Sequence, residues 1–329
     1  MPVLDSQATE AIARAAQALA DGELVAFPTE TVYGLGARAD DDAAVARIFA
    51  AKGRPADHPL IVHVSDAEAA QRFASDIPAV AQRLMQAFWP GPLTVIVPRA
   101  ADVGAAAAGG QGTIGLRCPA HPVAHALLVA AAQRGVTGVA APSANRFGRI
   151  SPTRAEHVAA EFGDALLVLD GGACRVGIES SIVDCSRGRA VLLRPGSLTR
   201  AQIEAAAHEA LAERDEAAPR ASGTLQAHYA PRAKLRLMPA GLLRQALDLL
   251  TQGGNTGGLK LAVYSRSVSV PRGIGHRVMP GDAAQAAHEL FSVLRELDDE
   301  GAQLIWVEQP PDTPDWEGVR DRLQRAAAA

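Results

Sequence analysis

Apolar and polar positions alternate between helix-like and strand-like patterns from the start of the chain. Within residues 12–19 the apolar side chains recur every three or four positions, which predicts an amphipathic helix that ends near Gly22. The short apolar run at 24–27 is typical of a buried strand. A second helix is predicted from about 41 to 53, and a second strand at 60–64.

The same alternation continues over the first two hundred residues. Strands are predicted at 93–97, 113–117, 138–141, 166–169, 181–185 and 190–194, and helices at 78–88, 122–133, 153–162 and 199–211. This order of elements indicates an α/β fold. Several strands are short and joined by loops rather than by crossover helices, so we expect a twisted mixed sheet with flanking helices.

The chain is predicted to contain two domains, because its 329 residues exceed what one hydrophobic core usually organises. Residues 1–212 form the first domain. Residues 213–233 carry charges, two prolines and no apolar period, which is typical of a linker. Residues 234–329 form a small Rossmann-like α/β domain, with strands at 235–238, 259–264 and 304–307 and helices at 241–250 and 283–297. We expect its alanine-rich tail, from Ala326, to fray.

Composition narrows the class of protein. Hydrophobic residues make up 48% and charged residues 21% of the chain, which is typical of a globular protein. No apolar run approaches the roughly 20 residues of a membrane span, and a cytoplasmic protein is expected. The net charge of -4 gives no overall reason to expect nucleic-acid binding. Three cysteines without a C-x-x-C pair argue against a disulfide framework and a thiolate zinc site.

Familiar nucleotide motifs are absent from the sequence. In the glycine-rich segment 253–260 a leucine separates the last glycine from Lys260, and no serine or threonine follows, so the P-loop pattern is not met. The segments 34–36 and 273–275 each lack the third glycine of a dinucleotide-binding loop. Residues 253–258 are therefore expected to be a plain hairpin or loop.

A pair of histidines, His121 and His125, has the spacing of metal ligands on a helix. No glutamate follows the first histidine as in zinc proteases, and Pro122 indicates a helix start. We interpret them as two partly exposed histidines.

Four polar loops at the predicted strand and helix ends carry the candidate chemistry. They are 28–36, rich in hydroxyls and glycine; 52–55, with Lys52 and Arg54; 113–117, with alternate residues on one strand face; and 141–151. Singly, each has a simpler interpretation: Lys52 and Arg54 could be a solvated helix end, and the serine- and asparagine-containing turn only a turn.

Taken together, these segments resemble the threonylcarbamoyl-adenylate synthase family, whose YrdC-type domain carries a K-x-R and an S-x-N element. Here they are Lys52-Gly53-Arg54 and Ser143-Ala144-Asn145. The resemblance extends in order through P-T-E-T-V-Y-G-L-G at 28–36, W-P-G-P-L-T at 89–94, G-I-E-S-S-I-V-D at 177–184, L-R-P-G at 193–196, and the linker segments Ser222-Gly223 and H-Y-A-P at 228–231. It covers essentially the whole chain and implies the family's long, two-domain form.

The resemblance also implies roles for individual residues. The L-threonine-binding set is Thr31, His63, Arg117, Ala141 and Ser180; the ATP-binding set is Lys52, Arg54, His58, Thr113, Ser143, Asn145, Ser151, Arg194 and Tyr229; the catalytic set is Lys52, Arg54, Ser143 and Asn145. The planar fork of Arg117 suits an amino-acid carboxylate. Tyr229 belongs to the linker, which is expected to act as an active-site lid.

Two positions depart from the family's usual pattern. His58 stands where asparagine is common, and Ser181 where threonine is common. His58 can still donate a hydrogen bond to phosphate or ribose, and Ser181 keeps the hydroxyl, so we expect activity to be retained. On spacing alone, His63 would be a strand histidine with backbone partners; the resemblance reverses that interpretation.

The implied activity is synthesis of L-threonylcarbamoyladenylate from L-threonine, bicarbonate or CO2 and ATP, with Mg2+ bound through the ATP phosphates and pyrophosphate released. The product is expected to pass to the machinery that threonylcarbamoylates tRNA, with at most weak contact with RNA and no membrane partner. Two alternatives remain: a non-catalytic RNA-binding module of the same fold, and a carbamoyl-adenylate enzyme of metal-centre maturation. The second lacks support because the zinc-finger and acylphosphatase-like segments are missing.

Overall fold

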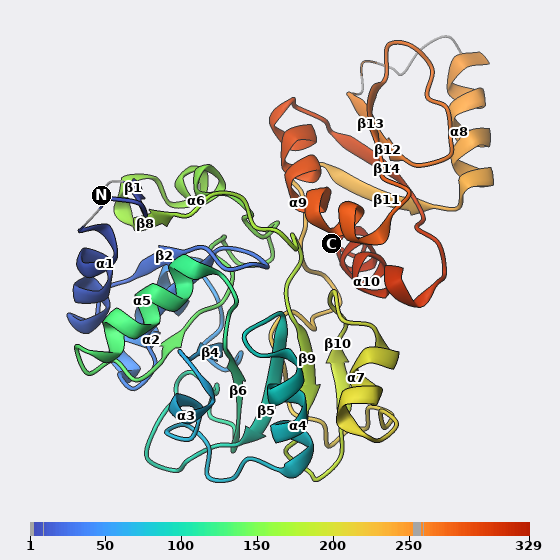
Figure 1. Cartoon of the computed structure of the whole chain (residues 1–329). Helices are drawn as coiled ribbons and strands as arrows, with labels where there is room; N and C mark the ends of the chain where they lie inside the picture. Colours follow the sequence, from blue (N-terminus) through green and yellow to red (C-terminus); the bar gives the residue numbers. More distant parts are fainter. Residues whose placement is uncertain (1–2, 9, 253–257, 259) are drawn as a thin grey trace. The chain divides into compact units, whose positions relative to one another are not determined.

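The computed structural model describes residues 3–8, 10–252, 258 and 260–329. The chain folds into two compact units, one formed by Met1–Phe147 and Ser151–Thr224 and the other by Gly148–Ile150 and Leu225–Ala329 (Figure 1). The division between Thr224 and Leu225 falls inside the segment expected to be a linker. Most of the segment 253–258, predicted to be a loop, lies outside the described residues.

The first unit is built on a ten-stranded sheet with the order β1-β8-β2-β3-β7-β4-β6-β5-β9-β10. Its strands are β1 (Val3–Asp5), β2 (Val25–Phe27), β3 (Gly34–Arg38), β4 (Ile61–His63), β5 (Leu93–Pro98), β6 (Thr113–Arg117), β7 (Val139–Ala140), β8 (Leu167–Asp170), β9 (Ser181–Asp184) and β10 (Val191–Arg194). The pairs β4·β6 and β5·β9 are parallel, whereas β5·β6 and β9·β10 are antiparallel. The predicted mixed sheet is confirmed.

Helices flank this sheet, as predicted (Figure 1). They are α1 (Ala11–Ala20), α2 (Asp42–Lys52), α3 (Ala67–Ala70), α4 (Ala79–Phe88), α5 (Pro122–Ala132), α6 (Ala155–Phe162) and α7 (Arg200–Ala207), with a 3-10 turn at Gly163–Ala165. Helix α1 packs against α5, and α4 packs against both α7 and β5. The last helix is shorter than the predicted 199–211, because Thr199 caps its start and His208 at φ 57° ends it.

The limits of α2 follow directly from its sequence. The Asp41 carboxylate accepts hydrogen bonds from the N–H groups of Ala43 and Ala44, which fixes the start. Gly53 ends the helix at φ 64°, a left-handed conformation that glycine adopts at little cost. This termination makes Lys52 the last helical residue and directs Arg54 into the following loop.

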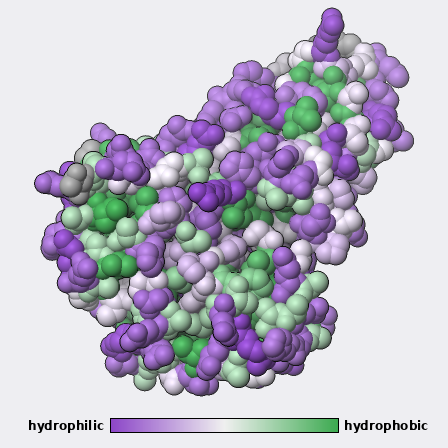
Figure 2. All heavy atoms as spheres, in the orientation of Figure 1, coloured by the Kyte–Doolittle hydropathy of each residue, from purple (hydrophilic) through white to green (hydrophobic). Residues whose placement is uncertain are grey.

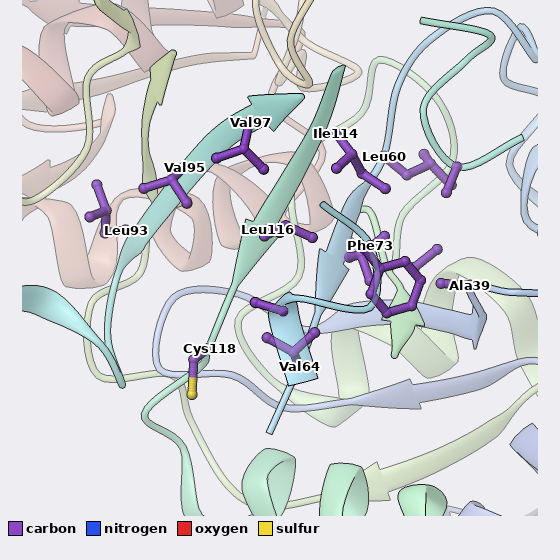
Figure 3. Close-up of a cluster of buried hydrophobic side chains, with 14 of the residues drawn as sticks. Ala39, Leu60, Val64, Phe73, Leu93, Val95, Val97, Ile114, Leu116 and Cys118 are labelled. Carbon is purple, nitrogen blue, oxygen red and sulfur yellow. The ribbon is translucent and has the colours of Figure 1, made fainter. Parts of the chain in front are cut away.

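Strands β4, β5 and β6 each have one face in the main hydrophobic core. Successive side chains of a strand point to opposite faces, so alternate residues enter the core. On β5 these are Leu93, Val95 and Val97, which Figure 3 shows beside Ile114 and Leu116 of β6. The residues between them on β4, β5 and β6 therefore point to the other face of the sheet.

The second unit is built on a four-stranded, all-parallel sheet with the order β11-β14-β12-β13. Its strands are β11 (Lys234–Met238), β12 (Leu261–Ser265), β13 (Gly275–Val278) and β14 (Leu304–Glu308); its helices are α8 (Ala240–Gln252), α9 (Ala283–Asp299) and α10 (Glu317–Ala327), with a 3-10 turn at Pro314–Trp316. A parallel sheet with crossover helices confirms the predicted Rossmann-like α/β unit.

Several features of the sequence were interpreted incorrectly or missed, and the short elements β1 and α3 are among those not predicted. Residues 34–36 are not loop: they open β3, which pairs with β2 in antiparallel register. Strand β13 is polar and was not predicted. The tail does not fray at Ala326, because that residue is 3% exposed within α10, whose apolar side packs against α9 and β11. Helix α10 was missed because its apolar positions are sparse.

No helix in the part of the chain that the structure describes has both the length and the apolar character needed to cross a bilayer. On the face drawn in Figure 2, patches of hydrophobic residues are interrupted by hydrophilic ones.

The replacement Gly36→Ala tests the close packing between β3 and its neighbours. A Cβ at this position would lie 2.7 Å from Val139 Cγ1 and 2.8 Å from Phe27 Cε1. We expect the free energy of unfolding to fall by about 1–3 kcal/mol, because overpacked side chains must shift. Urea unfolding measures it, with Gly112→Ala as the control, since a Cβ there meets no atom within 4 Å. Equal stabilities of the two variants would contradict the packing argument.

Candidate active site

Polar and cationic side chains occupy the sheet face that lies opposite the main core. His63 at the end of β4 is paired in register with Arg117 at the end of β6, so the two side chains lie next to each other on that face. Both residues are buried, at 3% exposure each. Thr113 and Gly115 lie earlier on β6 with the same orientation as Arg117. The sheet therefore presents a polar floor whose cation is shielded from water.

The Lys52 side chain is fixed by the loop that contains Ser143 and Asn145. Its ammonium donates a hydrogen bond of 2.6 Å to the carbonyl oxygen of Ser143 and a short one to that of Asn145. Lys52 is 3% exposed, so the alternative of a solvated helix end is wrong. The amine is placed at the turn that bears the two predicted polar residues, and it joins α2 to the segment after β7.

Backbone contacts join this turn to the segment 28–36. The N–H of Leu35 donates to Pro142 O and that of Ala144 to Tyr33 O, each at 2.8 Å, and Gly34 forms an isolated bridge with Ser143. These contacts hold the two loops edge to edge.

Arg54 lies beyond the end of α2 and contacts a neighbouring aromatic ring. Its Nη2 donates to Pro59 O at 2.9 Å, and its guanidinium carbon lies 5.8 Å from the centre of the Phe147 ring. The His58 ring meets the same phenylalanine edge-on at 5.6 Å. Burial and the nearby Arg54 cation lower the pKa of His58. Neutral His58 can therefore donate one hydrogen bond beside the Arg54 charge.

Arg117 forms a buried ion pair with Glu30. Its Nη2 lies 2.6 Å from Glu30 Oε1, and the two side chains are 4% and 9% exposed. The other carboxylate oxygen accepts a hydrogen bond from the N–H of Ala120 at 3.0 Å. Burying a single charge is costly, and this pairing is what makes an interior guanidinium tolerable.

A chain of hydrogen bonds joins β5, β9 and β10 at the same face. Thr94 Oγ1 and Ser180 Oγ lie 2.8 Å apart. Arg194 donates through Nε to Ser180 O at 3.0 Å and through Nη2 to Ser180 Oγ at 3.2 Å. Ser180 thus links the end of β10 to the floor of the sheet.

Ser151 lies in the loop that follows the turn at Ser143 and contacts the segment before Ser180. Its hydroxyl makes a short hydrogen bond to Glu179, the residue immediately before Ser180. Both Ser151 and Glu179 are buried. The Ser151–Glu179 contact therefore joins the loop after the Ser143 turn to the segment that Arg194 contacts at Ser180.

The hydroxyl of Thr31 lies at the opposite end of the floor, in the turn between β2 and β3. Thr29 Oγ1 lies 2.8 Å from Thr31 Oγ1 and also contacts Val32 O at 2.6 Å. Ala141, at the end of β7, donates its N–H to Ile61 O at 2.9 Å, which places it beside β4.

Residues 212–224, here called the strap, cross the site face of the sheet. Ala218 and Ala221 pack with Ile61, Ile96 and Ile182. Arg220 pairs with Asp57 at 2.7 Å, and the strap's Ser222 O accepts a hydrogen bond from Arg194 at 3.0 Å. The cavity between strap and sheet measures about 10 Å³ and is lined by Thr113 and Gly115 among others. The strap thus covers the predicted ATP residue Thr113.

Tyr229 belongs to the second unit and is buried in its interior. Its ring stacks on Phe291 with centroids 5.5 Å apart, and the Arg322 guanidinium lies over it at 5.2 Å. Its φ of 61° is unusual for a residue with a side chain. The predicted contact of Tyr229 with ATP stays a prediction.

Burial sets the protonation of two site residues. It lowers the pKa of Lys52 well below its usual range, with the Arg54 cation as the next cause. Burial and the Arg117 charge lower the pKa of His63 to about 3, so its imidazole is neutral at pH 7. Backbone groups of Ile61 and Val139 hydrogen-bond the imidazole, which agrees with the alternative of a strand histidine with backbone partners, whereas Nδ1 has no hydrogen-bond partner among the described residues.

A separate cavity of about 990 Å³ lies among α3, α4 and the residues after β4 and β6. Trp89, Met85 and His125 are among its lining residues, and none of the predicted site residues is. The candidate site is thus not this cavity but the polar face of the sheet.

Comparisons with known proteins agree with this site. A family described as telomere recombination matches residues 17–196, and one described as threonylcarbamoyl-AMP synthase, C-terminal domain, matches residues 198–328. The chain is 38% identical to the threonylcarbamoyl-AMP synthase of Pyrococcus abyssi, over 95% of this chain and 93% of the relative. It is also 38% identical to that of Bacillus subtilis, over 96% and 92%.

Solved structures give the same result. The crystal structure of P. abyssi Sua5 complexed with L-threonine matches with a TM-score of 0.87 and 36% identity, over 96% of this chain and 94% of that one. The chain belongs to the threonylcarbamoyl-AMP synthase family. The predicted resemblance is confirmed, and the protein is an enzyme of this family's type.

The structure brings together most of the residues to which the threonylcarbamoyl-AMP synthase resemblance assigns roles. Those in the first unit are all the predicted site residues except Tyr229. They lie on neighbouring strands and the loops at their ends, apart from Lys52, which is the last residue of α2. Their separate roles in binding L-threonine or ATP remain predictions. Ser181, one of the two departures, has a buried hydroxyl without a hydrogen-bond partner in the described part of the chain.

Three polar residues were not assigned a role from the sequence: Glu30, Thr94 and Glu179. Each contacts a predicted site residue directly. All three lie within segments that carry the family resemblance, which is the signal that could have identified them.

The two spaced histidines have different surroundings. His121 accepts the N–H of Val123 at 3.2 Å and so caps α5, whereas His125 is exposed. Their interpretation as partly exposed histidines is confirmed. Within the described ranges, no group of three or more histidine, cysteine and acidic side chains could hold a metal ion.

The neutral state of His63 makes stability depend on pH. Its folded-state pKa of about 3 lies below the ordinary value of 6.5, so the unfolded chain takes up a proton first, and acid favours unfolding from about pH 6.5 down to pH 3. Between pH 7 and 5 we expect the wild type to lose about 2 kcal/mol more unfolding free energy than His63→Asn. Urea unfolding at both pH values measures this, with exposed His125→Asn as the control. Parallel losses in wild type and His63→Asn would contradict it.

Proposed function

We propose that the protein condenses L-threonine, bicarbonate or CO2 and ATP into L-threonylcarbamoyladenylate and releases pyrophosphate. The observation that carries this proposal is the gathering of polar residues at neighbouring strand ends of one sheet: Lys52 with the Ser143 turn, Ser151 with Glu179, Ser180 with Arg194, and His63 with Arg117. The family membership supports the reaction class, and the related P. abyssi protein has been crystallised with L-threonine.

The threonine half of the site is assigned to Arg117, His63, Thr31, Ala141 and Ser180. A guanidinium offers two parallel N–H groups to a carboxylate. Neutral His63 and the threonine hydroxyl supply single hydrogen bonds, and the unpartnered Nδ1 of His63 is available for the amine or hydroxyl of the substrate.

The ATP half of the site is assigned to a set of cationic and polar residues. They are Lys52, Arg54, His58, Thr113, Ser143, Asn145, Ser151, Arg194 and Tyr229. Cations, hydroxyls and backbone N–H groups suit phosphate oxygens. A triphosphate beside Lys52 also favours its charged form, which burial alone disfavours.

The reaction needs no covalent enzyme intermediate. The threonine amine adds to CO2 and loses a proton to give a carbamate. A carbamate oxygen then bonds to the α-phosphorus of ATP as the bond to pyrophosphate breaks. The enzyme contributes by holding two anionic substrates in contact and excluding water, because the carbamate is short-lived.

Mg2+ is proposed to enter with ATP. The side chains around Lys52 and Arg194 donate hydrogen bonds and suit phosphate better than a metal, and Mg2+ commonly binds through phosphate oxygens and keeps several waters. When bound, it neutralises charge on the triphosphate.

The strap is proposed to act as part of a lid. A cavity of about 10 Å³ holds at most about one water molecule, so ATP reaches Thr113 only after the strap shifts. The product is then proposed to pass to the tRNA threonylcarbamoyl-transfer machinery in the cytoplasm, where ATP and tRNA are present. No observation favours the RNA-binding alternative.

One assay tests the proposed reaction. The pure protein is incubated with ATP, Mg2+, bicarbonate and labelled L-threonine, and we expect pyrophosphate and a threonine-containing adenylate in equal amounts. L-alanine in place of L-threonine is the control. Salt-dependent RNA binding without threonine-dependent pyrophosphate release would refute the synthase and favour the RNA-binding module.

Arg54→Ala tests the role of the cation after α2. We expect turnover to fall on the order of a hundredfold, as for the loss of one donor to a developing charge. Arg47→Ala is the matched control, because Arg47 is an arginine of the preceding helix α2 that contacts Gly22 O instead. Near wild-type pyrophosphate release by Arg54→Ala would remove Arg54 from the catalytic set.

A further inference from the structure

Glu30 is a buried carboxylate to which neither the sequence resemblance nor the proposed reaction assigns a role. It lies in the turn between β2 and β3 and is 7% exposed. Both of its oxygens are used: one accepts from Arg117 Nη2 at 2.6 Å, the other from the N–H of Ala120 at 3.0 Å. Glu30 therefore contacts Arg117 at the end of β6 and Ala120 just after it.

The backbone of Glu30 adds a third connection. Its carbonyl oxygen accepts the N–H of Val176 at 2.7 Å, and its neighbours Thr29 and Thr31 are joined through their hydroxyls. One residue thus ties the turn that bears Thr31 to the segment before Glu179 and to Arg117.

The contacts of Arg117 leave part of its fork free. Nε lies 3.4 Å from Gly91 O and Nη2 is held by Glu30, whereas Nη1 makes no hydrogen bond to a described residue. A guanidinium held on one edge by a protein carboxylate presents its remaining N–H groups in a fixed direction.

We infer that Glu30 is a positioning residue for L-threonine: it holds the guanidinium of Arg117 so that the free N–H groups face the substrate carboxylate. This inference rests on the proposed function. Glu30 acts on the substrate only through Arg117. It also offsets the buried charge of Arg117 before the substrate arrives, so that the empty site remains folded.

Glu30→Gln removes the charge and nearly keeps the shape. The amide no longer makes a charge-assisted bond, so Arg117 loses its fixed direction. We expect the KM for L-threonine to rise on the order of tenfold, because misplaced binding groups lose the aligned contact. The KM for ATP should stay within about twofold, since the ATP residues are held by other contacts.

Pyrophosphate release at varied L-threonine and ATP measures the two KM values separately. Exposed Glu23→Gln is the matched control for loss of a carboxylate. Glu30→Asp keeps the charge on a shorter side chain and should give a smaller rise. Thermal unfolding with and without ATP shows whether Glu30→Gln is folded. If too little of that variant folds, Glu30→Asp serves as the test in its place.

Combining Glu30→Gln with Arg117→Lys distinguishes positioning from general structural support. If Glu30 acts through Arg117, the double variant should raise the threonine KM little beyond Arg117→Lys alone. A full additional tenfold loss in the double variant would overturn the inference, as would an unchanged threonine KM in folded Glu30→Gln.

Calorimetry of the wild type with L-threonine distinguishes failure of the Glu30 role from failure of the proposed function. A wild-type protein that binds L-threonine and releases pyrophosphate, while Glu30→Gln does both equally well, refutes the role of Glu30 alone. A wild type that neither binds L-threonine nor releases pyrophosphate refutes the proposed function, and the role of Glu30 with it.

Discussion

The two-residue period of the central strands is the constraint on which the site depends. In β4, β5 and β6 one set of alternate residues is apolar and packs into the main core, whereas the other set includes His63, Thr94, Thr113 and Arg117. A shift of one residue in register would bury Arg117 in the apolar core and expose leucines at the site. The energy of the core thus fixes which face becomes polar, and the site follows from that choice.

Burying charges on this face requires partners, and the chain supplies them from distant segments. Glu30 pairs with Arg117 across 87 residues of sequence, and the carbonyls that receive the Lys52 ammonium lie 91 and 93 residues beyond it. Such buried polar contacts are costly to leave incomplete, so they fix the relative positions of the loops as well as the charges. The same contacts that stabilise the empty site therefore prepare it for anionic substrates.

The strap covers part of this face. Its contacts include alanines on isoleucines and an Arg220–Asp57 pair whose side chains are 52% and 61% exposed, together with hydrogen bonds from Gln111 to Arg220 and from the buried Arg194 to Ser222 O. Exposed ion pairs contribute little to stability, and small side chains bury little area. Apart from its bond with Arg194, the strap is held mainly by exposed contacts, unlike Arg117 or Lys52, and this weaker hold supports the proposed lid.

The sequence by itself determined the α/β class, nearly all the long elements, the end of α2 at Gly53 and the family, because these depend on local periodicity, capping and ordered motifs. It could not reveal that Lys52 is fixed by the carbonyls of its own S-x-N turn, that Glu30 holds Arg117, or that residues 34–36 form a strand. Those facts depend on contacts between segments far apart in the chain, which only the pairing of β2 with β3 and of β4 with β6 decides. The local sequence pattern determines which helices and strands form, whereas the tertiary packing determines which group pairs with each buried charge.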